Sequence, residues 1–191
     1  MKSCPAQDFF ILQTTIMSLT ATTEVELSRV PAFFHGYISK VPQTNLDEAF
    51  AYHQKALLSL LDSIPENKWD YRYAEGKWSI REIVQHVIDA ERIFCYRALC
   101  FARGEKTELP GFDENNYAAA SKADQRSSKS LKEELKSVQE SSAMLFASFD
   151  EEQLNASGIA NKHSNYVRGI GFIIVGHTLH HKSVLEERYL K

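Results

Sequence analysis

Apolar residues recur every three or four positions in four segments of this sequence, which is the spacing of helices that bury one face. The first segment ends where Pro65 interrupts the helical pattern. Its core-facing positions are Leu46, Phe50, His53, Leu57, Leu60 and Ile64. The second segment begins with a capping-box pattern, Ser79 and Glu82, and runs to Gly104, a residue type that commonly ends helices. Both segments are predicted to be amphipathic helices.

The third and fourth helices are predicted in the second half of the chain. Ser130 and Glu133 repeat the capping-box pattern and predict the start of a third helix, which continues to Phe149. Residues 150–164 are polar and are expected to form a loop, and Asn165 is suited to cap a fourth helix. Residues 104–128 form a connection that is long for a compact domain. No segment shows the alternation typical of a strand.

Four amphipathic helices without a sheet predict an all-α fold, a four-helix bundle. The long connection between the second and third helices predicts a crossover that leaves one pair of neighbouring helices parallel. The fourth helix has a second apolar face, which is expected to contact either a second copy of the chain or the N-terminal segment. That face carries Phe172, Val175, Leu179 and Leu190.

The chain divides into an N-terminal extension, residues 1–40, and a bundle domain, residues 41–191. The extension is expected to be partly disordered or packed on the bundle. Met17 is followed by a polar stretch of ordinary composition, so translation from Met1 or from Met17 stays open.

Composition excludes several classes of partner. The 191 residues are 43% hydrophobic and 25% charged, with a net charge of −3 and both signs interspersed, so neither nucleic acid nor a membrane surface is expected as a partner. No apolar run reaches the roughly 18 residues of a membrane span. Cys4, Cys95 and Cys100 form neither a disulfide framework nor a CxxC motif. Reduced thiols in a cytoplasmic protein are the expected state.

Two histidines, His177 and His181, lie one helical turn apart on the apolar stripe of the fourth helix. Buried imidazoles need a hydrogen-bond partner or a metal ion. His86, at the edge of the second helix's stripe, would meet them if the two helices are neighbours. Three neutral imidazoles with open remaining positions are a catalytic arrangement for zinc and also suit nickel. Such an ion lowers the pKa of bound water toward about 7 or acidifies a thiol, so hydrolysis and thiol transfer fit equally well.

Three further residues are weaker candidates for a catalytic role. His180 is about 80° off the line of His177 and His181 on a helix, which favours a supporting or surface position. His53 is either a hydrogen-bonded core histidine or a proton shuttle in the same cavity. Glu91 falls on the central stripe of the second helix, where its carboxylate needs a partner. Arg97 or a tyrosine would serve as that partner, and a catalytic base is the other role considered.

Three stretches resemble motifs of the DinB-like superfamily (DinB/YfiT type). They are residues 77–94, which include His86, residues 111–117 and residues 176–181. The resemblance extends from about residue 45 to the end of the chain. It implies an up-down-down-up four-helix bundle that forms a homodimer. It also implies one divalent ion, nickel or zinc, held by His86, His177 and His181.

Characterised members of the superfamily include bacillithiol transferases, mycothiol-dependent maleylpyruvate isomerases and proteins classed as metal-dependent hydrolases. The resemblance therefore implies a cytoplasmic metal-dependent enzyme that acts on a small-molecule substrate. In the transferase case a low-molecular-weight thiol would be the cosubstrate. Two alternatives stay open: a non-enzymatic, stress-related homodimeric bundle that binds a metal or ligand, and a purely structural bundle whose histidines are core groups.

Overall fold

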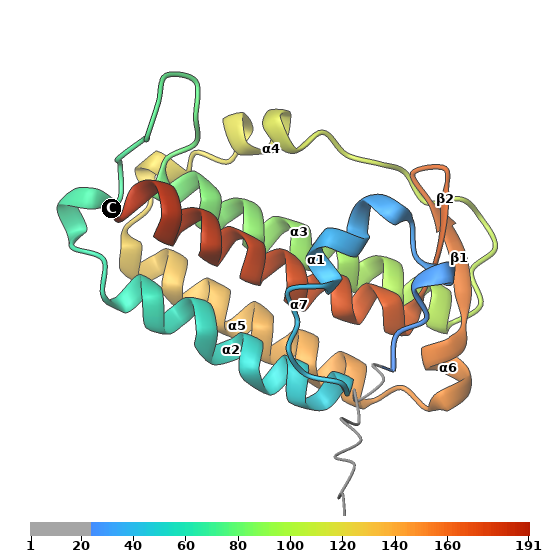
Figure 1. Cartoon of the computed structure of the whole chain (residues 1–191). Helices are drawn as coiled ribbons and strands as arrows, with labels where there is room; N and C mark the ends of the chain where they lie inside the picture. The colour runs from blue at the N-terminus through green and yellow to red at the C-terminus, as the bar shows by residue number, and fades with distance from the viewer. Residues whose placement is uncertain (1–23) are drawn as a thin grey trace, which may run out of the picture.

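Four long helices form a bundle in the computed structural model, which describes residues 24–191 (Figure 1). They are α2 (Leu46–Asp62), α3 (Ile80–Ala102), α5 (Ser128–Ala147) and α7 (Val167–Val184). α2 and α3 each pack against both α5 and α7, so α2 and α3 lie diagonally across the bundle. The start-site question lies outside the described residues. No helix among residues 24–191 is both long and apolar enough to cross a membrane.

The helices run up-down-down-up, which confirms the predicted fold class. α2 and α7 point one way, and α3 and α5 point the other (Figure 1). α3 and α5 are neighbours and parallel, because residues 103–127 carry the chain back along the length of the bundle. This crossover contains two short helices, α4 (Glu114–Ala120) and η4 (Ala123–Gln125). The predicted parallel pair is therefore present.

The ends of the bundle helices are set by local capping. Ser79 and Glu82 form the predicted capping box at the start of α3, and Gly104 follows its end with a φ of +80°. The third helix begins earlier than predicted, because Ser127 accepts a hydrogen bond from the backbone N–H of Ser130. Ser130 lies inside the helix, and its hydroxyl accepts a hydrogen bond from Arg126.

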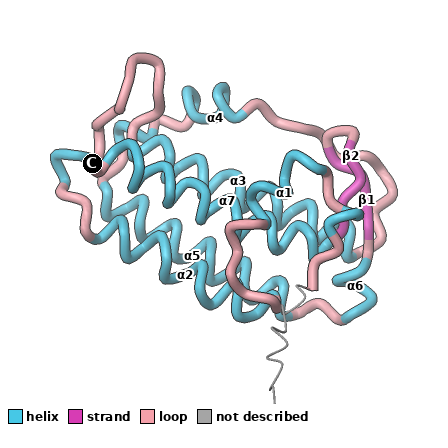
Figure 2. The backbone as a smooth tube through the Cα atoms, viewed as in Figure 1, coloured by secondary structure: helices cyan, strands magenta, loops and turns pink. Residues whose placement is uncertain are grey.

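The loop predicted for residues 150–164 is wrong, because residues 151–166 contain regular structure. They form α6 (Glu151–Asn155) and an antiparallel hairpin of β1 (Ser157–Ala160) and β2 (His163–Tyr166), with Ser157 paired to Tyr166 (Figure 2). Asn161 and Lys162 turn the hairpin, both with positive φ, as a two-residue turn of the primed type requires.

The strands were missed because each has four residues and little alternation of apolar and polar positions. The predicted N-cap of the last helix, Asn165, lies in β2. α7 starts after Tyr166 without a side-chain cap.

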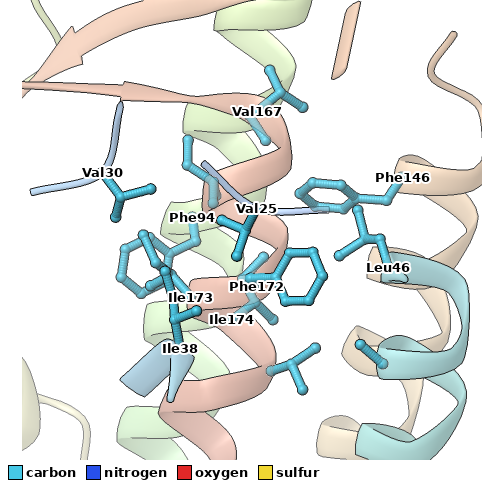
Figure 3. Packing of buried hydrophobic residues seen from close by; sticks show 14 of the residues in the cluster. Val25, Val30, Ile38, Leu46, Phe94, Phe146, Val167, Phe172, Ile173 and Ile174 are labelled. Atoms are coloured by element: carbon cyan, nitrogen blue, oxygen red, sulfur yellow. The ribbon is translucent and has the colours of Figure 1, made fainter. Parts of the chain in front are cut away.

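The N-terminal part of the described chain packs across α7. It contains η1 (Leu27–Arg29), η2 (Ala32–Phe34) and α1 (His35–Ile38). Figure 3 shows Val25 and Ile38 of this part beside Phe172 of α7. A Cβ added to Gly176 would lie 2.2 Å from the carbonyl oxygen of Tyr37, so the two backbones approach closely there. Of the predicted second apolar face, Phe172, Val175 and Leu179 are buried in the cluster that includes this segment, whereas Leu190 lies beyond α7 and packs against a different cluster.

The opposite end of the bundle is closed by a separate hydrophobic cluster. Trp69 follows η3 (Glu66–Lys68) and is fully buried among residues of α2, α3 and α5. The chain ends in a short π-helix, η5 (Leu185–Tyr189). The Tyr189 hydroxyl donates a hydrogen bond to the carbonyl oxygen of Trp78 at 2.7 Å, which joins the last turn to the start of α3.

Candidate metal centre

Three imidazoles converge between α3 and α7. His86 comes from α3, and His177 and His181 come from successive turns of α7, which packs beside α3. The Nε2 atom of His177 lies 3.1 Å from the Nε2 atoms of both His86 and His181. His86 and His177 are buried, and His181 is partly buried. The structure therefore brings together the three residues predicted as ligands.

Hydrogen bonding alone does not satisfy these three nitrogens. A neutral imidazole Nε2 either carries one proton to donate or one lone pair to accept. His177 Nε2 can therefore form a hydrogen bond with His86 or with His181, but not with both. The remaining contact would lack a well-directed hydrogen bond of its own. A cation between the three nitrogens removes this conflict.

The spacing also fits a transition-metal ion. A zinc–nitrogen bond of about 2.0–2.1 Å places two nitrogens about 3.1 Å apart when they subtend about 100° at the ion. The two observed Nε2···Nε2 distances are 3.1 Å, and all candidate ligand atoms lie within 4.8 Å of one another. Among residues 24–191, no further histidine, cysteine or carboxylate joins the cluster. An ion held here would keep open coordination positions.

The imidazoles are held in the neutral form that binds metals. Burial lowers the pKa of His86 to about 4 and lowers the pKa values of His177 and His181 well below the ordinary 6.5. The neighbouring histidines lower all three further, because a second positive charge nearby would repel the first. At neutral pH the cluster therefore presents lone pairs rather than charges.

The cluster opens into a cavity of about 530 Å³. Five separate parts of the chain line it: the N-terminal segment, the face of α3, the crossover before and in α4, the β1–β2 hairpin, and α7. Seven of its twenty lining residues are phenylalanine, tyrosine or tryptophan. These are Phe33, Phe34, Tyr37, Trp78, Phe94, Phe101 and Phe112. Such a cavity suits a small organic molecule with an apolar body.

Aromatic rings pack directly around the three histidines. The ring centre of Trp78 lies 4.8 Å from that of His86, and the ring centre of Tyr37 lies 5.4 Å from that of His177. Phe94 lies 6.2 Å from His177 on the cavity side. These rings limit access of water to the centre and fix the orientation of the imidazoles.

The weaker catalytic candidates lie outside the cavity lining. His53 is fully buried, and its Nε2 lies 3.1 Å from the Thr178 hydroxyl and 3.2 Å from the Gln139 amide nitrogen. Glu91 is paired with His53 at 3.3 Å, so the prediction that Arg97 or a tyrosine would partner it was wrong. The reason is the diagonal packing, which points Glu91 toward α2 in the bundle centre.

His180, the third weak candidate, supports the site from outside. Its ring centre lies 5.1 Å from both Tyr37 and His181, and it is not among the residues that line the cavity. Burial and the positive charges of Lys40 and Arg188 lower its pKa. The placement agrees with the predicted supporting or surface position.

Several cavity residues gave no signal in the sequence. Phe33, Phe34 and Tyr37 lie in a segment without a regular period, and His163 and Asn165 lie in the unpredicted hairpin. The adjacent asparagine and lysine of the turn were the local sign of that hairpin, because asparagine tolerates positive φ better than most residues. The free cysteines do not line the cavity, and burial raises the pKa of Cys95 to about 12.

Comparisons with known proteins agree with this fold. The solved structure of YfiT from Bacillus subtilis, described as "a probable metal-dependent hydrolase with an unusual four-helix bundle topology", is similar, with a TM-score of 0.63 and 16% sequence identity. The likeness covers 87% of this chain and 91% of that one. No curated protein matches the chain. The family model of the DinB superfamily matches residues 49–185, which include all three clustered histidines. The chain belongs to the DinB superfamily.

Proposed function

We propose that this protein is a metal-dependent enzyme that acts on a small molecule, as a hydrolase or a thiol S-transferase. The observation that carries the proposal is the meeting of the His86, His177 and His181 Nε2 atoms beside a cavity of about 530 Å³. The similarity to YfiT, described as a probable metal-dependent hydrolase, supports it. Zinc and nickel are the proposed ions, because imidazole suits both.

Different residues of the chain would have different roles in such a site. The three neutral imidazoles would hold the ion and leave its remaining positions toward the cavity. A bound divalent ion would lower the pKa of water or of a thiol and so supply a nucleophile at neutral pH. The surrounding aromatic rings hold the organic part of the substrate and exclude bulk water.

In the transferase case the thiol is a separate cosubstrate. Cys95 is largely buried away from the cavity, and its raised pKa keeps it a thiol at neutral pH. Cys100 is also absent from the cavity lining. The chain therefore offers no nucleophilic cysteine of its own among the described residues.

Metal analysis of protein purified without a histidine tag tests the proposal. We expect about one equivalent of zinc or nickel after supplementation. His177→Ala should lose most of it, because His177 lies between the other two ligands, while its helix content by circular dichroism stays close to that of the wild type. His180→Ala is the matched control on the same helix and should keep the metal.

Less than about a tenth of an equivalent in the supplemented wild type would contradict the proposal. With metal bound, electrophilic esters and thiol acceptors are then assayed with and without an added low-molecular-weight thiol. Turnover without thiol identifies a hydrolase, and turnover that requires thiol identifies a transferase. Metal and ligand binding with no turnover in either assay would favour the non-enzymatic binding protein.

A further inference from the structure

Three arginines of the described chain are buried to a similar degree, but one lacks the carboxylates that the other two have. The exposed fractions of Arg81, Arg97 and Arg168 are 7%, 9% and 8%. Arg81 forms ion pairs with Glu66 and Asp70. Arg168 likewise pairs with two carboxylates, those of Glu24 and Glu151. Arg97 is the exception, and it is the one that lines the cavity.

The Arg97 guanidinium has a single neutral partner within residues 24–191. Its Nη2 donates a hydrogen bond to the carbonyl oxygen of Pro110 at 3.0 Å, and no carboxylate lies within ion-pair distance. Burial lowers its pKa, and the charge of Glu114 at the exposed rim of the cavity only partly opposes that effect. A buried cation without a counter-ion is costly, so this position favours an anion.

The charges of the cavity wall indicate the charge of that anion. Among residues 24–191, Arg97 and Glu114 are the only Arg, Lys, Asp or Glu residues that line the cavity. Apart from an ion at the histidine cluster, one cation with a carboxylate at the rim suits a single negative charge better than a dianion. The planar guanidinium matches a carboxylate through paired hydrogen bonds. A monocarboxylate is therefore the favoured ligand.

Arg97 and His86, one member of the histidine cluster, face the same cavity from different points along α3. His86, Ala90, Phe94 and Arg97 follow one another at helical spacing on the lining face. The guanidinium carbon lies 5.8 Å from the Phe94 ring centre, which lies 6.2 Å from the His177 ring centre. The guanidinium is thus no farther from His177 than these two distances combined. A small organic molecule can span that separation.

We propose that Arg97 binds the carboxylate of a small organic acid whose apolar or aromatic body lies against Phe94 and whose reacting group reaches the histidine cluster. This assignment of substrate class rests on the proposed function, but Arg97 binding can be measured independently of it. The amide of the same acid should bind poorly, because it cannot neutralise the buried guanidinium.

Calorimetric titration with phenylbutyrate and phenylbutanamide tests the proposal. The full chain is titrated both freed of metal, where the carboxylate cannot bind an ion, and loaded with zinc. In both forms we expect the acid to bind at least about 10-fold more tightly than the amide. Arg97→Gln should weaken acid binding by about 10- to 100-fold and leave amide binding unchanged. Arg97→Lys should lie between the two, because it keeps the charge without the paired donors.

Arg103→Gln is the matched control, since Arg103 is exposed at the end of α3 and does not line the cavity. It should bind the acid like the wild type. Equal binding of acid and amide by the wild type, or equal acid binding by the wild type and both Arg97 variants, overturns the proposal. The acid-to-amide ratio of the wild type needs no variant, so misfolding of Arg97→Gln would not obscure the result.

The metal content of the same samples separates the two hypotheses. Acid binding that depends on Arg97 in a protein that takes up no metal would support this subsite and contradict the metal-dependent enzyme. Metal uptake with no preference for the acid would overturn this subsite and leave the metal-dependent enzyme standing.

Discussion

At the scale of single residues, the histidine cluster is costly to protonate in the folded protein. Burial is the first cause of the lowered pKa values of His86, His177 and His181, and repulsion from neighbouring histidines, His180 among them, adds to it. In the unfolded chain each would titrate near the ordinary value of about 6.5. The cluster therefore links the stability of the metal-free protein to pH.

The free energy of unfolding of the metal-free protein should fall as the pH drops from about 6.5 toward 4. Between these pH values the histidines are protonated in the unfolded chain but neutral in the folded cluster. The free energy of unfolding therefore rises with pH in this window. Each such histidine contributes up to about 1.4 kcal/mol per pH unit. Urea denaturation at several pH values measures the slope. His177→Ala should show a smaller slope, and identical slopes would contradict the prediction.

At the scale of elements, features encoded by neighbouring residues were predictable and features set by distant contacts were not. The capping box of Ser79 and Glu82 and the apolar stripes are local, so the bundle helices and their order could be predicted. The β1–β2 hairpin has no such pattern. Gly158 in β1 lies so close to the Phe101 ring that an added Cβ would come within 2.1 Å of it. That packing joins segments distant in sequence.

The same distinction explains which parts of the site could be predicted. His177 and His181 share one helix face, and a single neighbouring helix supplies His86. The apolar periodicity of two helices, together with the assumption that these helices are neighbours, was therefore enough to predict the histidine cluster. The cavity walls come from aperiodic segments, such as the one that holds Tyr37, and only the folded arrangement brings these to the histidines.

Ser127→Ala should reduce the free energy of unfolding by about 1 kcal/mol, because the N-cap hydrogen bond to Ser130 is lost. Ser137→Ala, an exposed serine in the middle of the same helix, is the control and should change stability by less than about 0.5 kcal/mol. Chemical denaturation measures both. A result in which Ser127→Ala matches the control would show that α5 begins later than the structure has it.

At the scale of the whole molecule, the N-terminal segment completes a cavity that the four-helix bundle leaves open. Pro31, Phe33, Phe34 and Tyr37 form one wall, held against α7 where Gly176 allows the backbones to touch. Gly176 immediately precedes a ligand candidate, His177. The contact that fixes the position of this wall therefore lies next to the histidine cluster.

Gly176→Ala should destabilise the protein by about 1–3 kcal/mol, because a Cβ 2.2 Å from a backbone oxygen forces α1 away from α7. Hydrogen exchange of the α1 amides should increase as well. Gly36→Ala is the matched control within α1, since an added Cβ there has no atom within 4 Å. Alanine at that position should be neutral or stabilising by up to about 1 kcal/mol. Equal effects of the two substitutions would contradict the close contact.

The wall that the N-terminal segment contributes has a consequence for how this protein could diversify. The clustered histidines lie within residues 49–185, the stretch shared with the DinB superfamily, whereas the aromatic wall at residues 31–37 precedes it. The proposed metal ligands and this one wall of the cavity therefore lie in separate stretches of the chain. Exchange of residues 31–37 between homologues would alter which molecules fit while every histidine of the centre stays in place.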